Sequence, residues 1–179
     1  MTPETDRRAQ EARFQNVFSH LGAVRAYARR RGSADPEAVA AEVMAVAWRR
    51  LADVPTDDAR PWLFATARNL LLAEWRKEPP RRLRGPAPEV ADLAPDIVLL
   101  EPEIARALRE LSLPDREALL LVAWEDLSPK QAAQAVGIGE GAFRVRLHRA
   151  RRRFRQALLG DAPTAGRHLN PTSLNMEGR

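Results

Sequence analysis

Apolar residues recur at intervals of three or four through most of the chain, which is the spacing of one helix face. One such stripe covers residues 14–28 and predicts a first helix. A second helix is expected after Asp35, a capping residue followed by Pro36, and a third from Pro61. No segment alternates apolar and polar residues as a strand does. The pattern therefore predicts an all-α fold, with a first small helical domain over residues 12–77.

Proline interrupts this periodicity in the middle of the chain. Residues 78–92 hold four prolines and one glycine, which removes backbone donors and disfavours helix. We expect a proline-rich linker over residues 78–96 and a second domain of four helices over residues 97–159. Residues 160–179 lack any apolar period and are expected to be a disordered tail.

The second domain carries a helix-turn-helix pattern. Ser128 and Gln131 have the spacing of a capping box, and Gly137 follows eight residues of helical pattern as a residue that tolerates a left-handed turn. A second helix then begins near Glu140. Its apolar positions share one face and are expected to be buried: Phe143, Leu147, Ala150 and Phe154. This layout is typical of a DNA-binding helix-turn-helix.

Basic residues concentrate on that last helix, where residues 144–155 hold seven arginines and no acid. The face opposite the apolar stripe is expected to meet base edges, and Arg149 has the geometry for a bidentate contact to guanine. Lys130 is expected to bind a phosphate. The alternative is a solvated surface, because only two of the 29 basic residues are lysine and arginine is common throughout. The predicted DNA-contacting set is Lys130, Gly141, Arg144, Val145, Arg146, His148, Arg149 and Arg152.

The third helix combines aromatic rings with cations. Trp62, Arg68, Asn69 and Arg76 are suited to stacking on single-stranded nucleic acid and neutralising its backbone. The alternative is that three tryptophans of the first domain are core residues of a small bundle: Trp48, Trp62 and Trp75.

Composition limits the classes of protein to which the chain could belong. The chain has 179 residues, a formal charge of +5 and no cysteine, which fits a cytoplasmic protein. No apolar run has membrane-spanning length, and a secretory signal is not expected from the charged first residues. No nucleophile–base pair, phosphate loop or metal-ligand spacing stands out, so neither an enzyme nor a cofactor or metal site is predicted.

The motifs in both halves resemble those of extracytoplasmic-function (ECF) sigma factors, the minimal two-domain initiation subunits of bacterial RNA polymerase. The C-terminal resemblance is carried by Leu127-Ser128, Val136-Gly137-Ile138 and Arg146-Leu147-His148-Arg149-Ala150-Arg151. The N-terminal resemblance is carried by Ala47-Trp48-Arg49-Arg50-Leu51 and Ala67-Arg68-Asn69-Leu70. Together the two resemblances cover about residues 14–77 and 97–158, and the proline-rich linker lies where the family has its own.

The resemblance implies partners and roles. The partners would be the polymerase core (the β′ clamp helices and the β flap) and promoter DNA, with an anti-sigma factor as a further candidate. The core-binding residues would be Val39, Glu42, Val43, Val46, Trp48, Arg49 and Arg50. The loop 51–60 and the third helix would open the −10 element and hold an extruded base, through Arg60, Trp62, Arg68, Asn69 and Arg76. The helix from Glu140 would bind the −35 element.

The sequence departs from the family pattern on the second helix. Ala38 and Ala41 stand where relatives often have acidic or amide residues, although Glu42 remains. Two other interpretations stay open. One is a stand-alone helix-turn-helix regulator with an N-terminal dimerisation domain, and the other is a sigma-like chain that binds only protein partners.

Overall fold

The computed structural model describes residues 3–77 and 101–160, and these are helical apart from short connections. A first helical unit contains α1 (Pro3–Phe18), α2 (Leu21–Arg30), α3 (Pro36–Arg49), the short 3₁₀ helix η1 (Leu51–Asp53) and α4 (Arg60–Lys77). A second helical unit contains α6 (Pro102–Glu110), α7 (Leu113–Ala123), α8 (Pro129–Val136) and α9 (Glu140–Leu159). No strand occurs in the described ranges, which confirms the all-α expectation. The linker 78–96 and the tail beyond Gly160 lie outside them.

The first apolar stripe forms two helices rather than one. The chain turns at Ser19 and His20, where the Ser19 hydroxyl donates to the Asn16 carbonyl at 2.6 Å and the His20 amide donates to the Val17 carbonyl at 3.1 Å. A serine hydroxyl that bonds its own backbone competes with the helical ladder. The prediction of a single helix over residues 14–28 was therefore wrong at these positions.

Local signals in the sequence account for most other helix ends. The Asp35 carboxylate accepts a hydrogen bond from the Ala38 amide at 2.9 Å and caps α3, as its spacing predicted. In the second unit, the Arg116 guanidinium donates to the carbonyls of Leu108, Arg109 and Leu111 at 2.6–3.3 Å. Arg116 therefore satisfies carbonyl groups at the end of α6 that the helix itself leaves unpaired.

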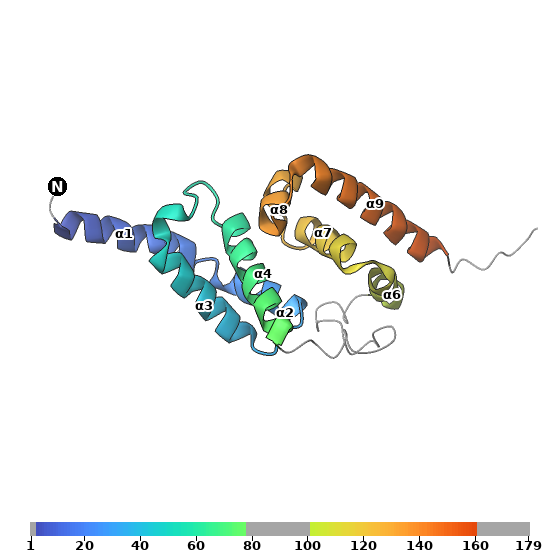
Figure 1. Cartoon of the computed structure of the whole chain (residues 1–179), viewed down its shortest axis with the longest axis horizontal. Helices are drawn as coiled ribbons and strands as arrows, with labels where there is room; N and C mark the ends of the chain where they lie inside the picture. The colour runs from blue at the N-terminus through green and yellow to red at the C-terminus, as the bar shows by residue number, and fades with distance from the viewer. Residues whose placement is uncertain (1–2, 78–100, 161–179) are drawn as a thin grey trace, which may run out of the picture.

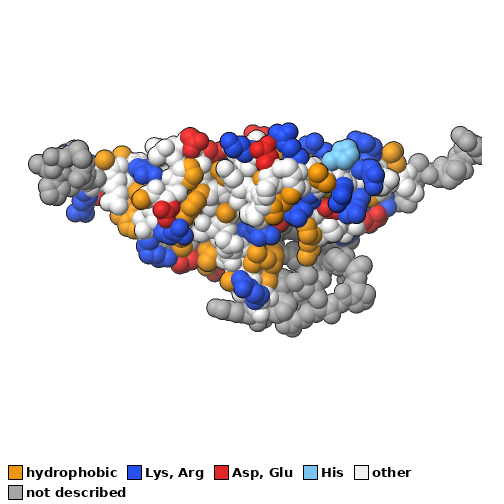
Figure 2. Space-filling model, turned by 45° about the horizontal axis from the view of Figure 1, so that its top comes forward, with side chains coloured by type: hydrophobic (Ala, Val, Ile, Leu, Met, Phe, Trp, Pro, Cys, Tyr) orange, Lys and Arg blue, Asp and Glu red, His pale blue; other side chains and the backbone are white. Residues whose placement is uncertain are grey.

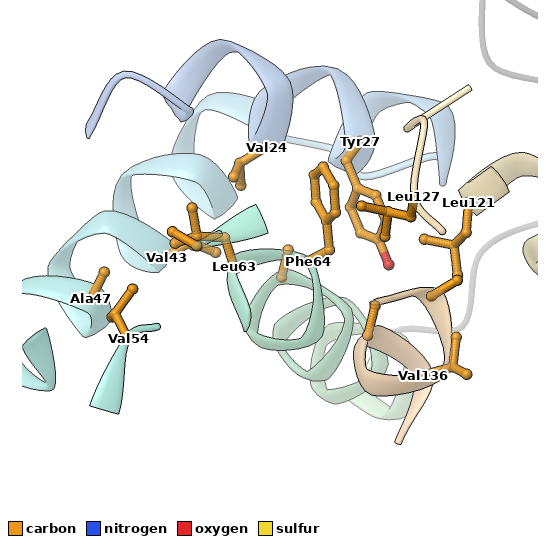
Figure 3. Packing of buried hydrophobic residues seen from close by; sticks show 14 of the residues in the cluster. Val24, Tyr27, Val43, Ala47, Val54, Leu63, Phe64, Leu121, Leu127 and Val136 are labelled. Atoms are coloured by element: carbon orange, nitrogen blue, oxygen red, sulfur yellow. The ribbon is translucent and has the colours of Figure 1, made fainter. Parts of the chain in front are cut away.

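The two helical units share one continuous hydrophobic core. Tyr27 stacks on Phe64 with ring centroids 4.8 Å apart inside the first unit. Leu121, Leu127 and Val136 of the second unit belong to the same buried cluster (Figure 3). Burying a leucine side chain stabilises a protein by about 1.5–3 kcal/mol, so this contact opposes separation of the units.

Helix α4 of the first unit lies against α8 of the second (Figure 1). A smaller cluster, centred on Leu108, Leu111 and Leu120, fills the space among α6, α7 and α9. In the structure the loop before α4 and the helix-turn-helix therefore lie side by side, although they are far apart in the sequence.

Candidate nucleic-acid interface

The predicted helix-turn-helix is present as α8, a short turn and α9. The Ser128 hydroxyl accepts from the Gln131 amide at 3.3 Å, and the Gln131 side-chain oxygen accepts from the Ser128 amide at 2.8 Å. This reciprocal pair is a complete capping box. Gly137 ends α8 with φ +72°, a left-handed conformation that strains any residue with a Cβ.

Helix α9 turns its apolar stripe inward, as the periodicity predicted. Phe143, Leu147 and Ala150 are buried, and Phe154 is half-buried against the smaller cluster. Most residues of the predicted DNA-contacting set on α9 are accessible: Gly141, Arg144, Val145, His148, Arg149 and Arg152 are exposed, and Arg146 is half-buried. Val145 is unusual there because it is apolar yet 51% exposed.

Basic side chains gather where α9 lies on the surface (Figure 2). Two arginines of α9 have carboxylate partners in the described structure. Arg144 pairs with Glu140 one turn earlier at 2.7 Å, an exposed contact that solvent weakens. Arg153 pairs with the buried Asp115 of α7, so this contact ties α9 to α7. Lys130 is exposed on the first turn of α8.

The predicted −10 residues on α4 are less accessible than those on α9. Arg60 is half-buried, and its side chain pairs with Asp58 at 3.0 Å. Trp62 is half-buried beneath Arg50, whose guanidinium carbon lies 6.0 Å from the ring centroid. Asn69 and Arg76 are exposed. Arg68 is half-buried and pairs with Glu117 of the second unit at 3.0 Å.

Asp58 connects the loop before α4 to the helix-turn-helix. Partial burial opposes its ionisation, but hydrogen bonds from the side chain and backbone of Arg60 outweigh burial, so the pKa of Asp58 falls below its ordinary value. The same hydrogen bond raises the pKa of Arg60. The second Asp58 oxygen also accepts from the side-chain amide of Gln131 at 2.7 Å. Gln131 thus caps α8 and contacts the first unit at once.

A hollow of about 560 Å³ lies between the end of α1 and this loop. Its polar lining includes Arg13, Asn16, His20 and Thr56. Arg13 donates to the Val54 carbonyl at 2.7 Å and holds the loop against α1. Residues 13, 16 and 20 were not among the predicted site residues, although a spacing of three and four is typical of one helix face. In the structure His20 lies in the turn between α1 and α2.

The predicted polymerase-binding residues of α3 divide into two groups. Glu42, Trp48, Arg49 and Arg50 are exposed, and Val39 and Val46 are half-buried. Val43 is 0% exposed, so it supports the helix from within the core and presents no atoms to a partner. That finding corrects its assignment as a contact residue.

An exposed aromatic group extends the α3 surface onto α1. Phe14 meets Trp48 edge-on, with centroids 4.9 Å apart, and lies 5.9 Å from Phe18. Trp48 and Phe18 are 43% and 48% exposed. Phe18 lies within the apolar stripe of residues 14–28 that predicted the first helix, and its exposure adds a surface residue that was not among the predicted site residues.

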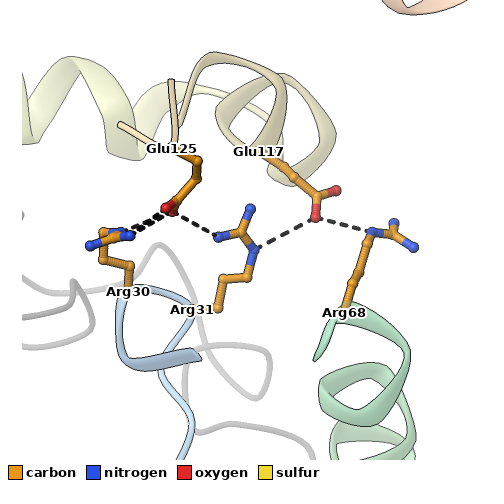
Figure 4. A network of polar contacts seen from close by, with 5 residues as sticks. All are labelled: Arg30, Arg31, Arg68, Glu117 and Glu125. Atoms are coloured by element: carbon orange, nitrogen blue, oxygen red, sulfur yellow. Dashed lines mark hydrogen bonds and ion pairs between the residues drawn. The ribbon is translucent and has the colours of Figure 1, made fainter. Parts of the chain in front are cut away.

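Three arginines of the first unit meet two glutamates of the second, and we refer to Arg30, Arg31, Arg68, Glu117 and Glu125 as the Arg–Glu cluster (Figure 4). Arg30 binds Glu125 through two nitrogens at 2.6–3.1 Å, and both side chains are buried. Arg31 lies 3.7 Å from Glu117 and 3.9 Å from Glu125. The cluster was not predicted, because its members lie far apart in the sequence.

Tyr27 lies directly beneath this cluster. The Arg31 guanidinium carbon is 3.5 Å from its ring centroid. Burial raises the pKa of Tyr27 to about 12, although the nearby Arg31 charge opposes the shift. The hydroxyl has no hydrogen-bond partner among the described residues.

No group of metal-ligating side chains occurs in the two described segments. Across the same residues, no helix is both long enough and apolar enough to cross a bilayer.

Comparison with known proteins agrees with this geometry. Residues 102–154, which span the second unit, match the family model for sigma-70, region 4. The ECF RNA polymerase sigma factor SigL of Mycobacterium tuberculosis H37Rv is 33% identical over 139 residues, covering 70% of this chain and 76% of SigL. The probable RNA polymerase sigma factor RfaY of Xanthomonas campestris is 35% identical over 79% of this chain, but the match spans only 38% of RfaY.

A solved structure gives the same result for the fold. The sigma factor RpoE of Bartonella quintana, determined with the anti-sigma factor NepR, aligns with a TM-score of 0.57 and 26% identity over 83% of this chain and 96% of RpoE. The alternative of a stand-alone regulator is not favoured, because the matched relatives are sigma factors across both halves of the chain. The chain belongs to the ECF family of RNA polymerase sigma factors.

Proposed function

We propose that this chain directs core RNA polymerase to specific promoters by binding the −35 element through α9 and opening the −10 element through the first helical unit. The observation that carries the proposal is the exposed arginine-rich face of α9, presented by a capped helix-turn-helix in a chain of this family. Sigma factors are non-catalytic subunits of transcription initiation. We propose that this one has no enzymatic activity of its own and acts in the cytoplasm.

The second unit would bind the −35 element as a duplex. Arg149 lies on the outward face, where a guanidinium can donate two hydrogen bonds to guanine. The exposed apolar Val145 fits a thymine methyl better than a phosphate. Lys130, Arg144, Arg146 and Arg152 would neutralise phosphates, and Gly141 and His148 would line the groove.

The first unit would bind the opened −10 strand. The hollow beside residues 54–60 has a volume of about 560 Å³ and a lining of amide, imidazole, hydroxyl, guanidinium and carboxylate groups, which offers both donors and acceptors to an extruded base. Trp62 and Asn69 would contact neighbouring bases, and Arg60, Arg68 and Arg76 would contact the backbone. Extruding a base costs a few kcal/mol, and contacts in such a hollow would offset that cost.

The polymerase core would bind along α3 and the end of α1. Exposed Glu42, Arg49 and Arg50 supply charge, while Trp48, Phe18 and the half-buried Val39 and Val46 supply apolar area. Tryptophan and arginine dominate many protein interfaces, which supports this surface as the site for the β′ clamp helices. The β flap would contact the second unit. An anti-sigma factor is a proposed further partner, since RpoE of Bartonella quintana was solved with one.

Reconstitution with core polymerase and a library of promoter sequences tests the proposal. We expect open complexes on a subset of sequences that share −35 and −10 elements, and none with core polymerase alone. Substituting Trp48→Ala should reduce open-complex formation by weakening the complex with core. The exposed Leu113→Ala, at the start of α7 and away from α3, is the matched control. Absence of any sequence-specific open complex would contradict the proposal.

A further inference from the structure

Gly141, in the first turn of α9, is a glycine that the fold itself does not require. Its backbone is not in the left-handed region, in contrast to Gly137 at φ +72°. A Cβ atom at position 141 would meet no atom of another part of the chain within 4 Å. Glycine within a helix lowers stability relative to alanine, because the unfolded chain has more conformational freedom to lose. The chain therefore keeps a destabilising residue at an exposed position where alanine would fit.

Gly141 begins a ridge along the face of α9 that is assigned to duplex DNA. Residues three or four apart lie on the same helix face, and this face continues through Val145, His148, Arg149 and Arg152, all of them exposed. The side chains lengthen along the ridge, from none at Gly141 to an isopropyl group at Val145 and to imidazole and guanidinium groups beyond. The ridge is therefore lowest at the N-terminal end of the helix.

The residues beside Gly141 leave this end of the helix free of long outward side chains. Ala142 is exposed and carries only a methyl group. Glu140, the one acidic residue of α9, binds Arg144 one turn later at 2.7 Å. The backbone at Gly141 is therefore accessible, and the ridge itself carries no negative charge that would repel DNA.

We propose that Gly141 sets the depth at which α9 enters the major groove, so that the methyl groups of Val145 reach the methyl group of a thymine in the −35 element. The proposal rests on the proposed binding of α9 to duplex DNA. It adds the residue that controls the depth of insertion and, through that depth, the base preference at Val145. Gly141 is thus a positioning residue, because its effect on sequence preference passes through Val145.

The dimensions of the groove make a missing side chain matter. An α-helix with its side chains is about 10–12 Å across, and the major groove is about 12 Å wide and about 8.5 Å deep. Because the helix fills the width, its distance from the base edges depends on the side chains of the ridge that faces them. Backbone Cα atoms lie only about 2.3 Å from the helix axis, so glycine allows the closest approach. A carbon added at position 141 would lift this end of α9.

Val145 is close enough to Gly141 to be lifted with it. Four residues of helix rise about 6 Å, so the two residues face positions about one to two base pairs apart. The side chain of Val145 is 51% exposed in the unbound chain and can bury a thymine methyl. Contacts between methyl groups are short-ranged, and a gap of about 0.5–1 Å removes about a quarter to a half of the attraction. Thymine preference at Val145 should therefore depend on the residue at position 141.

Two measurements on Gly141→Ala separate this role from folding. Urea unfolding of the full chain should show an equilibrium constant for folding about twofold to fivefold larger than in the parent chain. Binding of the variant with core polymerase to a promoter selected with the parent chain should be weakened about fivefold or more. Gly22→Ala is the matched control, because Gly22 is an exposed helical glycine of α2 with the same open space. It should gain similar stability and leave promoter affinity unchanged.

Replacing each thymine of the −35 element by deoxyuridine gives the direct readout, since it removes only the methyl group. With the parent chain, one replacement should weaken binding about fourfold, the effect expected for one buried methyl group. With Gly141→Ala, the same replacement should have no effect, and Val145→Ala should abolish the sensitivity in the same way. A variant that was merely misfolded would lose affinity without a selective loss at one thymine.

The outcomes distinguish this inference from the proposed function. A Gly141→Ala chain that binds the promoter as tightly as the parent, or that keeps the thymine sensitivity, would overturn the inference alone. Lower stability in Gly141→Ala would also overturn it, because the glycine would then serve the fold. A parent chain that binds the selected promoter no better than a scrambled sequence would overturn the proposed function and the inference with it.

Discussion

Helices α9 and α4 both present arginines that the sequence assigns to nucleic acid, yet their surroundings differ. On α9, Arg149 and Arg152 project into solvent from a helix whose opposite face is buried. On α4, Arg68 forms an ion pair with Glu117 of the second unit. Arg60, at the start of the same helix, forms an ion pair with Asp58. Arginine content alone therefore does not identify an accessible nucleic-acid surface. An accessible surface is instead identified by whether carboxylates surround each guanidinium group.

The comparison also explains why the two helices differ in tolerance to substitution. An exposed arginine on α9 contributes little to folding, because surface charges are well solvated. In the Arg–Glu cluster, which lies between the units, Arg30 and Glu125 are buried and Arg68 and Glu117 are half-buried, so removing one partner is expected to reduce stability. Four predictions test this difference, in order of decreasing effect.

Removing Glu125 should have the largest effect on stability. Glu125→Ala deletes the bidentate partner of the buried Arg30 guanidinium, and breaking a buried pair in this way costs about 3–5 kcal/mol. Urea unfolding followed by circular dichroism measures the change. The exposed pair of Arg106 and Glu110 is the control, and Glu110→Ala should change stability by no more than about 0.5 kcal/mol. Similar small losses in both variants would mean that the Arg–Glu cluster does not hold the units together.

Alkaline pH should lower the stability of the folded chain through Tyr27, the only tyrosine in the chain. Its pKa is raised by burial to about 12 in the folded protein, so the unfolded chain releases the proton first. The contribution of protonated Tyr27 to the free energy of unfolding is therefore fully present below pH 10. It is lost as pH rises from about 10 to 12, and the free energy of unfolding falls by about 1.4 kcal/mol per pH unit in that range. Unfolding measured across this range, with phenolate absorbance as the second readout, checks it. Tyr27→Phe should remove the Tyr27 part of the slope, and an identical slope would contradict the assignment.

On α9, Arg149→Ala should reduce discrimination at one base pair of the −35 duplex by about 1–3 kcal/mol. Arg151→Ala is the matched comparison, since Arg151 is exposed on the flank of the same helix. It should weaken all sequences equally and reduce the salt slope by about 1. Fluorescence anisotropy on a set of single-base duplex variants, at several salt concentrations, measures both. The same uniform loss in both variants would disprove the proposed orientation of the recognition face.

The capping box should show the smallest effect. Ser128→Ala removes the acceptor of the Gln131 amide and should cost about 1 kcal/mol, within a range of about 0.5–2 kcal/mol. Ser128→Thr keeps an acceptor at this position and should retain most of the stability. Thermal unfolding of both variants provides the measurement. If Ser128→Ala lost as much stability as Glu125→Ala, the α8 cap would contribute more to the stability of the interface than the structure indicates.

The features that the sequence predicted correctly depend on residues close together in the chain. The capping box of Ser128 and Gln131 and the buried face of Phe143, Leu147 and Ala150 follow from spacings of three and four. Local hydrogen bonding and helix periodicity decide such features. The split between α1 and α2 was missed because the Ser19 hydroxyl contact does not alter the apolar pattern.

The features that the sequence missed depend on contacts between distant residues. Arg30 and Glu125 are separated by 95 positions and Arg68 and Glu117 by 49, so no periodicity connects them. The assignment of Val43 to a polymerase contact failed for a related reason. Apolar residues on α3 serve either the core or a partner, and only the packing of α2 and α4 shows that Val43 is fully buried.

The central claim is that α9 and α4 bind separate promoter elements, and thymine reactivity in reconstituted open complexes tests it most directly. With core polymerase and a selected promoter, the parent chain should make thymines of the −10 element reactive to permanganate. Arg149→Ala should leave that reactivity in place once its concentration saturates the promoter, whereas Arg68→Ala should lower it at every concentration. Equal loss in both variants at saturation, or reactivity that persists unchanged in Arg68→Ala, would contradict the claim.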